Sequence, residues 1–299
     1  MALERRKTKT SPKVWTKTEE KKLYEYLIQG NVSLKDIQKE FPDRSMVSLR
    51  SKIRKLRIKH DIFGNSYRVD KERFTINIAE TIKPQIVFDA YSGAGHQTLQ
   101  WINYANIVFA SEISKQKYNM LIENLIVNDF KKVKGKFENW LSFKKGQKYI
   151  HTFNGDAVKA AAYISVYQNS IDLVDLDTCG TTIPTLPIYL NLLRPKYVVI
   201  THGEYHSLRF DREDVLRRVL CHRSIMESPG KLNDFNDELD KAVKTSSIRA
   251  HNEIKDSFYP QIIDEIWLGE KTQGMLRRLY KIGRPVSAAD CINEISNQV

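Results

Sequence analysis

Residues 85–112 read QIVFDAYSGAGHQTLQWINYANIVFASE, and this stretch decides the fold. Its first six residues are mostly apolar, as in a buried strand, and they pass directly into a loop that contains Gly93 and Gly95. A helical stretch follows the loop, and a second apolar run ends at Glu112. Strand, glycine loop, helix and strand in this order predict the first unit of a parallel sheet with crossover helices.

The polar residues of this unit predict a nucleotide cofactor. Glycines let the backbone approach a ligand, and an acid about twenty residues beyond the first strand accepts hydrogen bonds from ribose hydroxyls. Asp89 closes the first strand and Glu112 closes the second, which matches this spacing. Thr98 stands where a dinucleotide fingerprint has its third glycine, and Asp89 precedes the loop. In both respects the pattern resembles the S-adenosylmethionine-dependent methyltransferases.

This resemblance implies a set of contacts to S-adenosylmethionine. In that family the glycine loop holds the methionine part, the acid after the second strand holds the ribose, and an acid after the third strand contacts the adenine. A Rossmann-like sheet without a cofactor is the alternative that the pattern leaves open. The cofactor-binding residues implied for this chain are Asp89, Tyr91, Gly93, Gly95, Glu112 and Asp156.

The fourth predicted strand, IDLVDLD, carries the candidate catalytic acids. Asp175 and Asp177 lie on the same side of an extended strand, at the edge where a switch-point crevice is expected. The stretches DAYSGAGHQTLQW, SEISKQKYNMLIENLIVND, NGDA and DLVDLDTCGTTIPTLP resemble the tRNA N2,N2-dimethylguanosine methyltransferases, over residues 85 to about 206. In that family an Asp after the fourth strand receives the target amino group and an aromatic ring stacks the base.

The chain departs from this family's motif at two positions, with Thr178 in place of a proline and Cys179 in place of the aromatic residue. A cysteine cannot stack a base, so Tyr91, His202 or Tyr205 would have to supply the missing ring or polar contact. Cys179 as a covalent nucleophile is a second interpretation, which the proline missing before it disfavours. An inert small loop residue is the simpler reading of this cysteine.

A small helical module is predicted between residues 14 and 60. Three short helical patterns follow one another, and Trp15 precedes an acidic first helix while the third helix is strongly basic. This pattern resembles the Myb/SANT-like helix-turn-helix domains. The resemblance implies a recognition helix, although such domains also bind proteins. The candidate nucleic-acid-binding residues are Arg44, Arg50, Lys52, Arg54, Lys55 and Arg57.

The whole chain is therefore expected to be an α/β protein with two unequal domains. A disordered basic arm (1–13) precedes the helix-turn-helix (14–60), and residues 61–84 form a linker or a wing. A Rossmann-like methyltransferase domain (85–290) with a helical insertion at about 208–260 completes the chain. Its mostly parallel sheet is expected to end in an antiparallel hairpin, formed by IIDEIWLGE and GMLRRLYKIGR.

Charge and cysteine usage narrow the class of function. Up to Arg73 the chain has 20 Lys and Arg against 10 Asp and Glu, so most of the net charge of +12 lies in this quarter and favours nucleic acid as partner. Its three cysteines, Cys179, Cys221 and Cys291, lack the spacing of a disulfide framework or a zinc site, and no metal is expected. Without an apolar signal or spanning segment, we expect a cytoplasmic protein that does not enter membranes.

Two functions follow from these observations. The first is a nucleic-acid methyltransferase that uses S-adenosylmethionine and docks DNA or RNA through its helix-turn-helix. The second is a DNA-binding regulator or assembly factor whose methyltransferase fold has lost catalysis. The sequence leaves open the base modified, and also a protein partner or a homo-oligomer.

Overall fold

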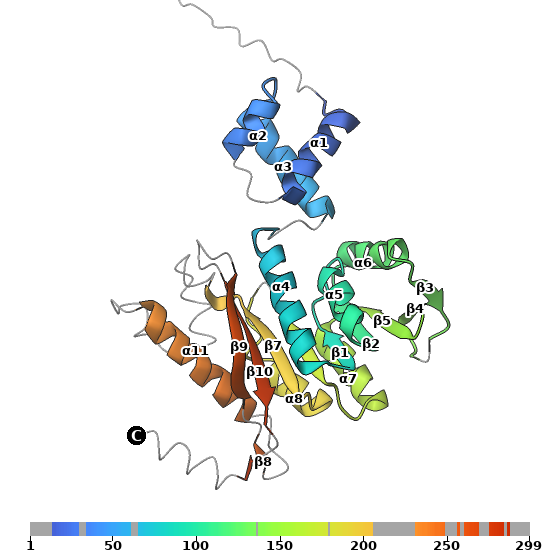
Figure 1. Cartoon of the computed structure of the whole chain (residues 1–299), viewed down its shortest axis with the longest axis vertical. Coiled ribbons are helices and arrows are strands. Elements are labelled where there is room, and N and C mark those ends of the chain that lie inside the picture. The colour runs from blue at the N-terminus through green and yellow to red at the C-terminus, as the bar shows by residue number, and fades with distance from the viewer. Residues whose placement is uncertain are drawn as a thin grey trace, which may run out of the picture. The chain divides into compact units, whose positions relative to one another are not determined.

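The chain forms two compact units, residues 1–66 and 67–299. The computed structural model describes residues 14–29, 34–60, 65–135, 137–178, 180–205, 231–248, 256–257, 260–268, 275–283 and 286–287 (Figure 1). The arm expected at residues 1–13, the first part of the expected insertion and Cys179 lie outside these ranges. No described helix is long and apolar enough to cross a bilayer.

The first unit consists of three helices around a small core: α1 (Lys17–Gln29), α2 (Leu34–Glu40) and α3 (Met46–His60). Thr16 begins α1 with a reciprocal cap, because its hydroxyl accepts from the amide of Glu19 while the Glu19 carboxylate accepts from the amide of Thr16. The apolar stripes that the sequence pattern indicates meet in one cluster. Its buried members are Leu23, Leu27, Ile37, Phe41, Leu49, Ile53 and Leu56.

The second unit is built on a nine-stranded sheet with the order β3-β4-β5-β2-β1-β6-β7-β10-β9. A separate short antiparallel pair is made by β8 (Asp256–Ser257) and β11 (Val286–Ser287). The strands of the large sheet are β1 (Ile86–Asp89), β2 (Ile107–Glu112), β3 (Lys131–Val133), β4 (Leu141–Lys145), β5 (Lys148–Asn154), β6 (Leu173–Leu176), β7 (Tyr197–His202), β9 (Pro260–Leu268) and β10 (Met275–Ile282).

The centre of this sheet is parallel and both of its flanks are antiparallel. β1 pairs with β2 on one side and with β6 on the other, while β5 and β7 continue the two directions. The expected antiparallel hairpin is confirmed, since β10 pairs with β9 and joins the sheet against β7. On the opposite flank, β3 and β4 extend the sheet beyond β5 and were not anticipated from the sequence.

Helices cover both faces of the sheet (Figure 1). One face packs against α4 (Asn65–Ile82), α5 (His96–Tyr104) and α6 (Lys115–Val127), with fully buried Trp101 at the centre of the layer. The other face packs against α7 (Ala157–Tyr167), α8 (Leu186–Leu193) and α11 (Lys231–Ile248). This three-layer arrangement confirms the expected Rossmann-like α/β class.

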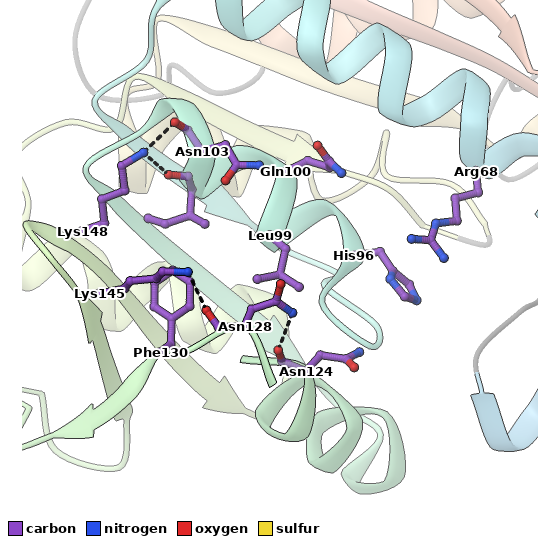
Figure 2. A pocket seen from close by; sticks show the side chains of 11 residues that line it. Arg68, His96, Leu99, Gln100, Asn103, Asn124, Asn128, Phe130, Lys145 and Lys148 are labelled. Carbon is purple, nitrogen blue, oxygen red and sulfur yellow. Dashed lines mark hydrogen bonds between the residues drawn. The ribbon is translucent and has the colours of Figure 1, made fainter. Parts of the chain in front are cut away.

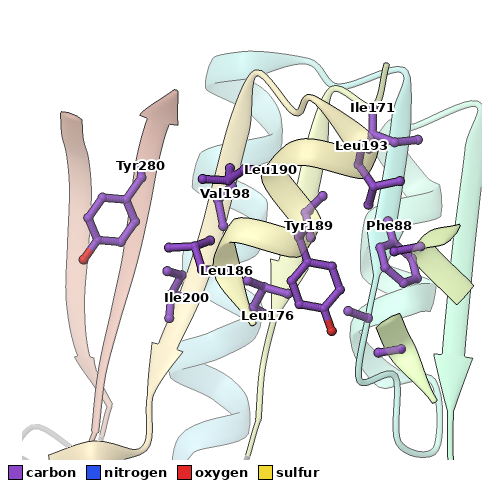
Figure 3. Close-up of a cluster of buried hydrophobic side chains, with 14 of the residues drawn as sticks. Phe88, Ile171, Leu176, Leu186, Tyr189, Leu190, Leu193, Val198, Ile200 and Tyr280 are labelled. Atoms are coloured by element: carbon purple, nitrogen blue, oxygen red, sulfur yellow. The ribbon is translucent and has the colours of Figure 1, made fainter. Parts of the chain in front are cut away.

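The packing of helix α8 explains why the sequences of the parallel strands are continuous apolar runs. Its Leu186, Tyr189, Leu190 and Leu193 face a sheet surface formed by Phe88, Leu176, Val198 and Ile200 (Figure 3). Strands covered on both faces have no solvent side, so alternation of polar and apolar residues disappears.

Helix α4 corrects the expectation of a linker or wing at residues 61–84. Residues 65–82 form an 18-residue helix, and Phe74, Ile78 and Ala79 bury their side chains in the core beneath α5. The apolar residues of this helix include exposed Val69 as well as the buried ones, which is why the sequence pattern alone was weak. Residues 61–64 lie outside the described ranges.

Candidate functional site

The candidate site lies where the carboxyl ends of the parallel strands meet. β2 and β6 lie on opposite sides of β1, so the strand order reverses at β1. The connections that leave the carboxyl ends of the strands diverge at this point and leave a crevice between them. The ends of β1, β2, β5, β6 and β7 all point to it. The glycine loop, Glu112, Asp156 and Asp177 therefore come together although they are far apart in sequence.

The glycine loop after β1 requires both of its glycines. Gly93 and Gly95 have φ angles of 54° and 86°, in the left-handed region that favours glycine. A Cβ at position 95 would also stand 2.3 Å from Cδ1 of Leu121 on α6. At Gly95 the loop therefore packs directly against α6, with no room for a side chain at this position.

Glu112 joins the end of β2 to this loop. Its Oε2 accepts a hydrogen bond of 3.0 Å from the amide of Gly93, and its Oε1 accepts one of 2.7 Å from the amide of Ser114. The side chain of Ile113, next in the chain, is 72% exposed. A partly exposed carboxylate beside an exposed apolar side chain offers a hydrogen-bond acceptor and a flat contact to one ligand. Sequence reasoning did not single out Ile113.

Asp156 lies at the same edge, after β5. It begins α7, and its Oδ1 accepts from the amides of Val158 and Lys159 at 2.9 and 3.1 Å. Its side chain is exposed, so a ligand can reach it from solvent. The role that the resemblance implies for this acid, contact with an adenine, is compatible with its place.

Asp89 and Asp175 lie deeper, side by side in the register of β1 and β6. Oδ2 of Asp175 accepts from the Trp101 indole at 2.8 Å and from the Arg277 guanidinium at 2.7 Å. Oδ2 of Asp89 accepts from the Thr98 hydroxyl at 2.6 Å. Burial, and next the Asp175 carboxylate, raise the pKa of Asp89 well above its ordinary value.

This arrangement corrects the expectation for Asp175. Asp175 is 0% exposed and does not face the crevice, and Asp89, a predicted cofactor contact, is 1% exposed. The physical reason is Arg277, a cation on β10 that enters the sheet's interior and holds Asp175 in a buried ion pair. The two acids stabilise the ends of β1 and β6 from the protein interior, through their hydrogen bonds from Thr98 and Trp101 on α5.

Asp177 stands just beyond the end of β6. Both of its oxygens accept hydrogen bonds from the ammonium group of Lys71 on α4, at 2.8 and 2.7 Å. Burial alone would raise the pKa of Asp177, but the cations Lys71 and Arg277 outweigh this effect and hold the pKa below its usual value. Asp177 is therefore a carboxylate, and its 15% exposed side chain still reaches the surface. Lys71 was not identified from the sequence.

Two of the residues considered as replacements for the missing aromatic ring are buried. Tyr205 packs edge-on against Phe235 and Trp267, and His202 donates to or accepts from the Tyr280 hydroxyl at 3.0 Å. Tyr91 remains half-buried beside the loop, where its hydroxyl lies 2.9 Å from that of Tyr189. Of the three, Tyr91 alone keeps a place at the crevice.

Glu204 is a third residue to which sequence reasoning assigned no role. It follows β7, is 1% exposed, and neither of its carboxylate oxygens has a hydrogen-bond partner. Nδ1 of His202 lies 3.6 Å from its Oε2. Among the described part of the chain, no group of three His, Cys, Asp or Glu side chains could hold a metal ion.

In the first unit, Arg44 is structural and corrects another expectation. Its side chain is 2% exposed, and its guanidinium bonds Oε2 of Glu19 at 2.6 Å and stacks 4.4 Å from the Trp15 ring centre. Lys52 likewise pairs with Glu20 and lies over Trp15. Glu19 and Glu20 neutralise the charges of these two cations, and the resulting ion pairs join α1 to the later part of the unit.

The remaining predicted nucleic-acid-binding residues lie on α3. Arg50 and Lys55 are exposed, as a phosphate-contacting residue must be. The side chains of Arg54 and Arg57 lie outside the described residues, although their backbone belongs to α3.

Solved structures of other proteins have a fold similar to that of this chain. No protein-family profile matches the sequence, and no curated protein sequence matches it. Among solved structures, Trm1 from Pyrococcus horikoshii, determined with S-adenosyl-L-methionine, aligns with a TM-score of 0.54 and 16% identity. This chain has a methyltransferase fold. The alignment covers 72% of this chain and 54% of Trm1, so the methyltransferase-fold chain spans about half the length of that relative.

Two further solved structures align with lower scores. Trm5b from Pyrococcus abyssi aligns with a TM-score of 0.40 and 11% identity over 73% of this chain and 49% of its own. M. jannaschii TYW2, determined in complex with AdoMet, aligns with a TM-score of 0.40 and 13% identity over 73% of this chain and 75% of its own.

Proposed function

We propose that this chain is an S-adenosylmethionine-dependent methyltransferase that acts on nucleic acid and docks the polymer through its N-terminal helical unit. One observation carries the proposal: the glycine loop, Glu112 and Asp177 occupy the same carboxyl edge of the sheet, at its switch point. A cofactor held by the first two would lie beside the third.

The donors and acceptors at this edge fit S-adenosylmethionine. Gly93 and Gly95 hold the loop in left-handed backbone conformations, which lets the loop backbone approach the methionine part, and Gly95 packs this loop closely against Leu121 of α6. Glu112 offers acceptors for the ribose hydroxyls, and Asp156 offers one for the adenine amino group. Exposed Ile113 supplies an apolar surface for the ring. Asp89 serves as a positioning residue for the loop, because it is buried and bonds only to Thr98 among these groups.

The proposed chemistry at Asp177 is orientation and charge stabilisation. When bound, the cofactor supplies an electrophilic methyl group. Asp177 accepts a hydrogen bond from the target amine and so directs the nitrogen lone pair, and its negative charge stabilises the positive charge that develops on that nitrogen. Lys71 has to release at least one of its two hydrogen bonds when the amine arrives. Asp175 and Arg277 are positioning residues: both side chains are fully buried, and their ion pair fixes the end of β6, from which Asp177 follows.

The N-terminal unit is the proposed docking module. Exposed Arg50 and Lys55 on α3 are its phosphate-contacting residues, and Arg54 and Arg57 remain in this set as predictions from the sequence. Arg44 and Lys52 leave the set because acidic partners neutralise them.

A second candidate function is a regulator that keeps the fold without catalysis. The observation that favours it is the altered motif after β6, where Thr178 donates to the carbonyl of Gly180 and no aromatic ring is offered. In that case the Lys71 and Asp177 pair would be a permanent part of the structure.

Two measurements on the full chain separate these functions. Calorimetric titration with S-adenosylmethionine and S-adenosylhomocysteine tests the cofactor site, and transfer of a tritiated methyl group to mixed cellular DNA and RNA tests turnover. Binding with transfer, abolished by Asp177→Asn, supports the enzyme. Binding without transfer to any polymer supports the regulator, and no binding of either cofactor form rejects both the cofactor site and the enzyme.

A further inference from the structure

A second basic cluster lies in the methyltransferase-fold unit, far from the N-terminal module in sequence. Residues 131–148 contain seven lysines and one acid, Glu138. They form β3, β4 and the turn into β5, which is the flank that extends the sheet beyond its parallel centre. Acidic residues elsewhere in the unit balance this cluster, so net charge over long stretches does not reveal it.

Two pairs of these lysines face one another. In the register of the antiparallel strands, Lys145 stands directly opposite Lys148, and Lys131 stands directly opposite Lys144. Like charges in such cross-strand pairs are destabilising. The Lys145 ammonium also lies 3.7 Å from the carboxylate of Asp129, an exposed surface ion pair that offsets only part of this repulsion. The flank keeps an excess of positive charge, which favours a polyanionic ligand.

A groove leads from this flank to the candidate active edge. It has a volume of about 570 Å³ and runs along α5 and α6. Figure 2 shows Lys145 and Lys148 at one end and Arg68 and His96 at the other. His96 is the first residue of α5, directly after Gly95 of the cofactor loop. The groove thus ends beside the proposed methyl-transfer site.

The lining of this groove suits a phosphate backbone. Four amide side chains, Gln100, Asn103, Asn124 and Asn128, lie between the basic ends, and the described lining includes no Asp or Glu. Lys148 donates only to the carbonyl oxygens of Ile102 and Asn103, at 2.7 and 2.6 Å, and no carboxylate of the described residues lies within ion-pair distance of it. Its charge is therefore available to an anion.

We propose that this groove, between Arg68 and His96 at one end and Lys145 and Lys148 at the other, binds the phosphate backbone of a single nucleic-acid strand. The inference rests on the proposed function in taking nucleic acid as the substrate. The strand runs along α5 and α6, and the nucleotide to be modified enters the crevice beside His96. The methyltransferase-fold unit then holds its substrate directly, in addition to the contacts of the N-terminal unit.

The test is a double variant with one substitution at each end, Arg68→Gln/Lys145→Gln. Lys148 is kept because it caps the carboxyl end of α5. The matched control, Lys241→Gln/Lys281→Gln, removes the same charge from exposed positions on α11 and β10. The probe is a fluorescein-labelled, mixed-sequence, single-stranded RNA of about 20 nucleotides, a length above the roughly 4–16 that one single-strand site covers. Anisotropy is measured against NaCl concentration without cofactor.

The groove variant is expected to lose about 1.4 from the slope of log affinity against log salt, and to bind about 10- to 30-fold more weakly at 0.1 M salt. Its melting temperature is expected to stay within about 2 °C of the wild type, because the variant is relieved of one repulsive lysine pair but loses the surface ion pairs of Arg68 with Glu72 and of Lys145 with Asp129. The control variant is expected to bind RNA like the wild type.

Three outcomes would overturn the proposal. One is an unchanged slope and affinity in the groove variant. Another is an equal loss in both double variants, which would mean nonspecific charge. The third is displacement of the RNA by poly-glutamate at similar concentrations, with the same dependence on Arg68 and Lys145, which would identify an acidic protein segment as the partner. Cofactor binding is measured separately, so failure of the proposed enzyme activity remains distinguishable.

Discussion

The ammonium group of Lys71 donates to both carboxylate oxygens of Asp177, at 2.8 and 2.7 Å, and so joins α4 to the residue that follows β6. The pair is only partly exposed, with 18% and 15% of the two side chains accessible. In the proposed reaction the target amine seeks the same oxygens. The resting structure therefore already contains a nitrogen donor where the substrate nitrogen is to be received.

Replacement of Lys71 by Met is expected to move the acidic limb of the pH–rate profile upward. The Lys71 cation helps to hold the pKa of Asp177 below its ordinary value, against the effect of burial. Without this cation the carboxyl takes up a proton at a higher pH, so the acidic limb is expected to move to higher pH. The limb is measured from pH 4 to 8 by tritium transfer. A limb that does not move would assign the ionisation to another group.

Replacement of Asp177 by Asn is expected to reduce the rate of methyl transfer by about 100-fold or more while leaving cofactor affinity within about twofold. The carboxylate is lost, but the shape is kept. Single-turnover transfer and calorimetry are the two measurements. A variant that transfers methyl groups at the wild-type rate would exclude Asp177 from the reaction.

Replacement of Gly95 by Ala is expected to destabilise the chain by about 1–3 kcal/mol and to abolish measurable cofactor binding. The new methyl group would stand 2.3 Å from Leu121 Cδ1 at a left-handed φ of 86°. Gly146→Ala is the control, since Gly146 has a φ of 60° but no atom within 4 Å of the added Cβ. If the two variants behaved alike, close packing against α6 would not be the cause.

The buried pair of Asp175 and Arg277 is expected to behave as a coupled unit. Arg277→Met leaves Asp175 charged and unpaired in the interior, so a loss of about 3–5 kcal/mol in the free energy of unfolding is expected. Asp175→Asn should cost a comparable amount, and the double variant should cost much less than the sum. Urea unfolding of all four proteins measures the coupling. Strict additivity would contradict a direct pairing.

The stability of the N-terminal unit is expected to fall in acid. The hydrogen bond from Arg44, followed by that from the Thr16 amide, lowers the pKa of Glu19 to about 2, from an ordinary value of 4.5. Since the folded-state pKa is depressed, the stabilisation is complete above pH 4.5 and is lost as the pH falls toward 2. Hydrogen exchange of α1 to α3 in the full chain measures this loss. Glu19→Gln should show a weaker dependence over the same range, since the pKa of Glu40, lowered by its hydrogen bond from Lys22, is unchanged in this variant.

The sequence was sufficient for the parallel centre of the sheet because consecutive local patterns agree there. The glycine loop and Glu112 needed only spacing along one strand–helix–strand unit. Asp175 was misjudged because its environment is set by Arg277, which lies 102 residues further along the chain. Strand alternation is a local rule and cannot report a partner delivered by β10.

Other features escaped for related reasons. Helix α4 has exposed as well as buried apolar residues, and the three that matter, Phe74, Ile78 and Ala79, become visible as core residues only when the sheet is in place. Arg44 carries the same charge as Arg50, but Glu19 and Trp15 enclose it. The basic flank at residues 131–148 was hidden because charge was summed over a stretch long enough to include its acidic compensation.

The position of Arg277 on β10 also has a consequence for how the sheet closes. β10 lies between β7 and β9, and it delivers the guanidinium that pairs with Asp175, 102 residues earlier in the chain. Asp89 and Asp175 are neighbours in the register of β1 and β6, and burying two adjacent carboxyl groups without a cation is costly. The parallel centre of the sheet and its antiparallel hairpin are therefore expected to unfold together, as one cooperative unit.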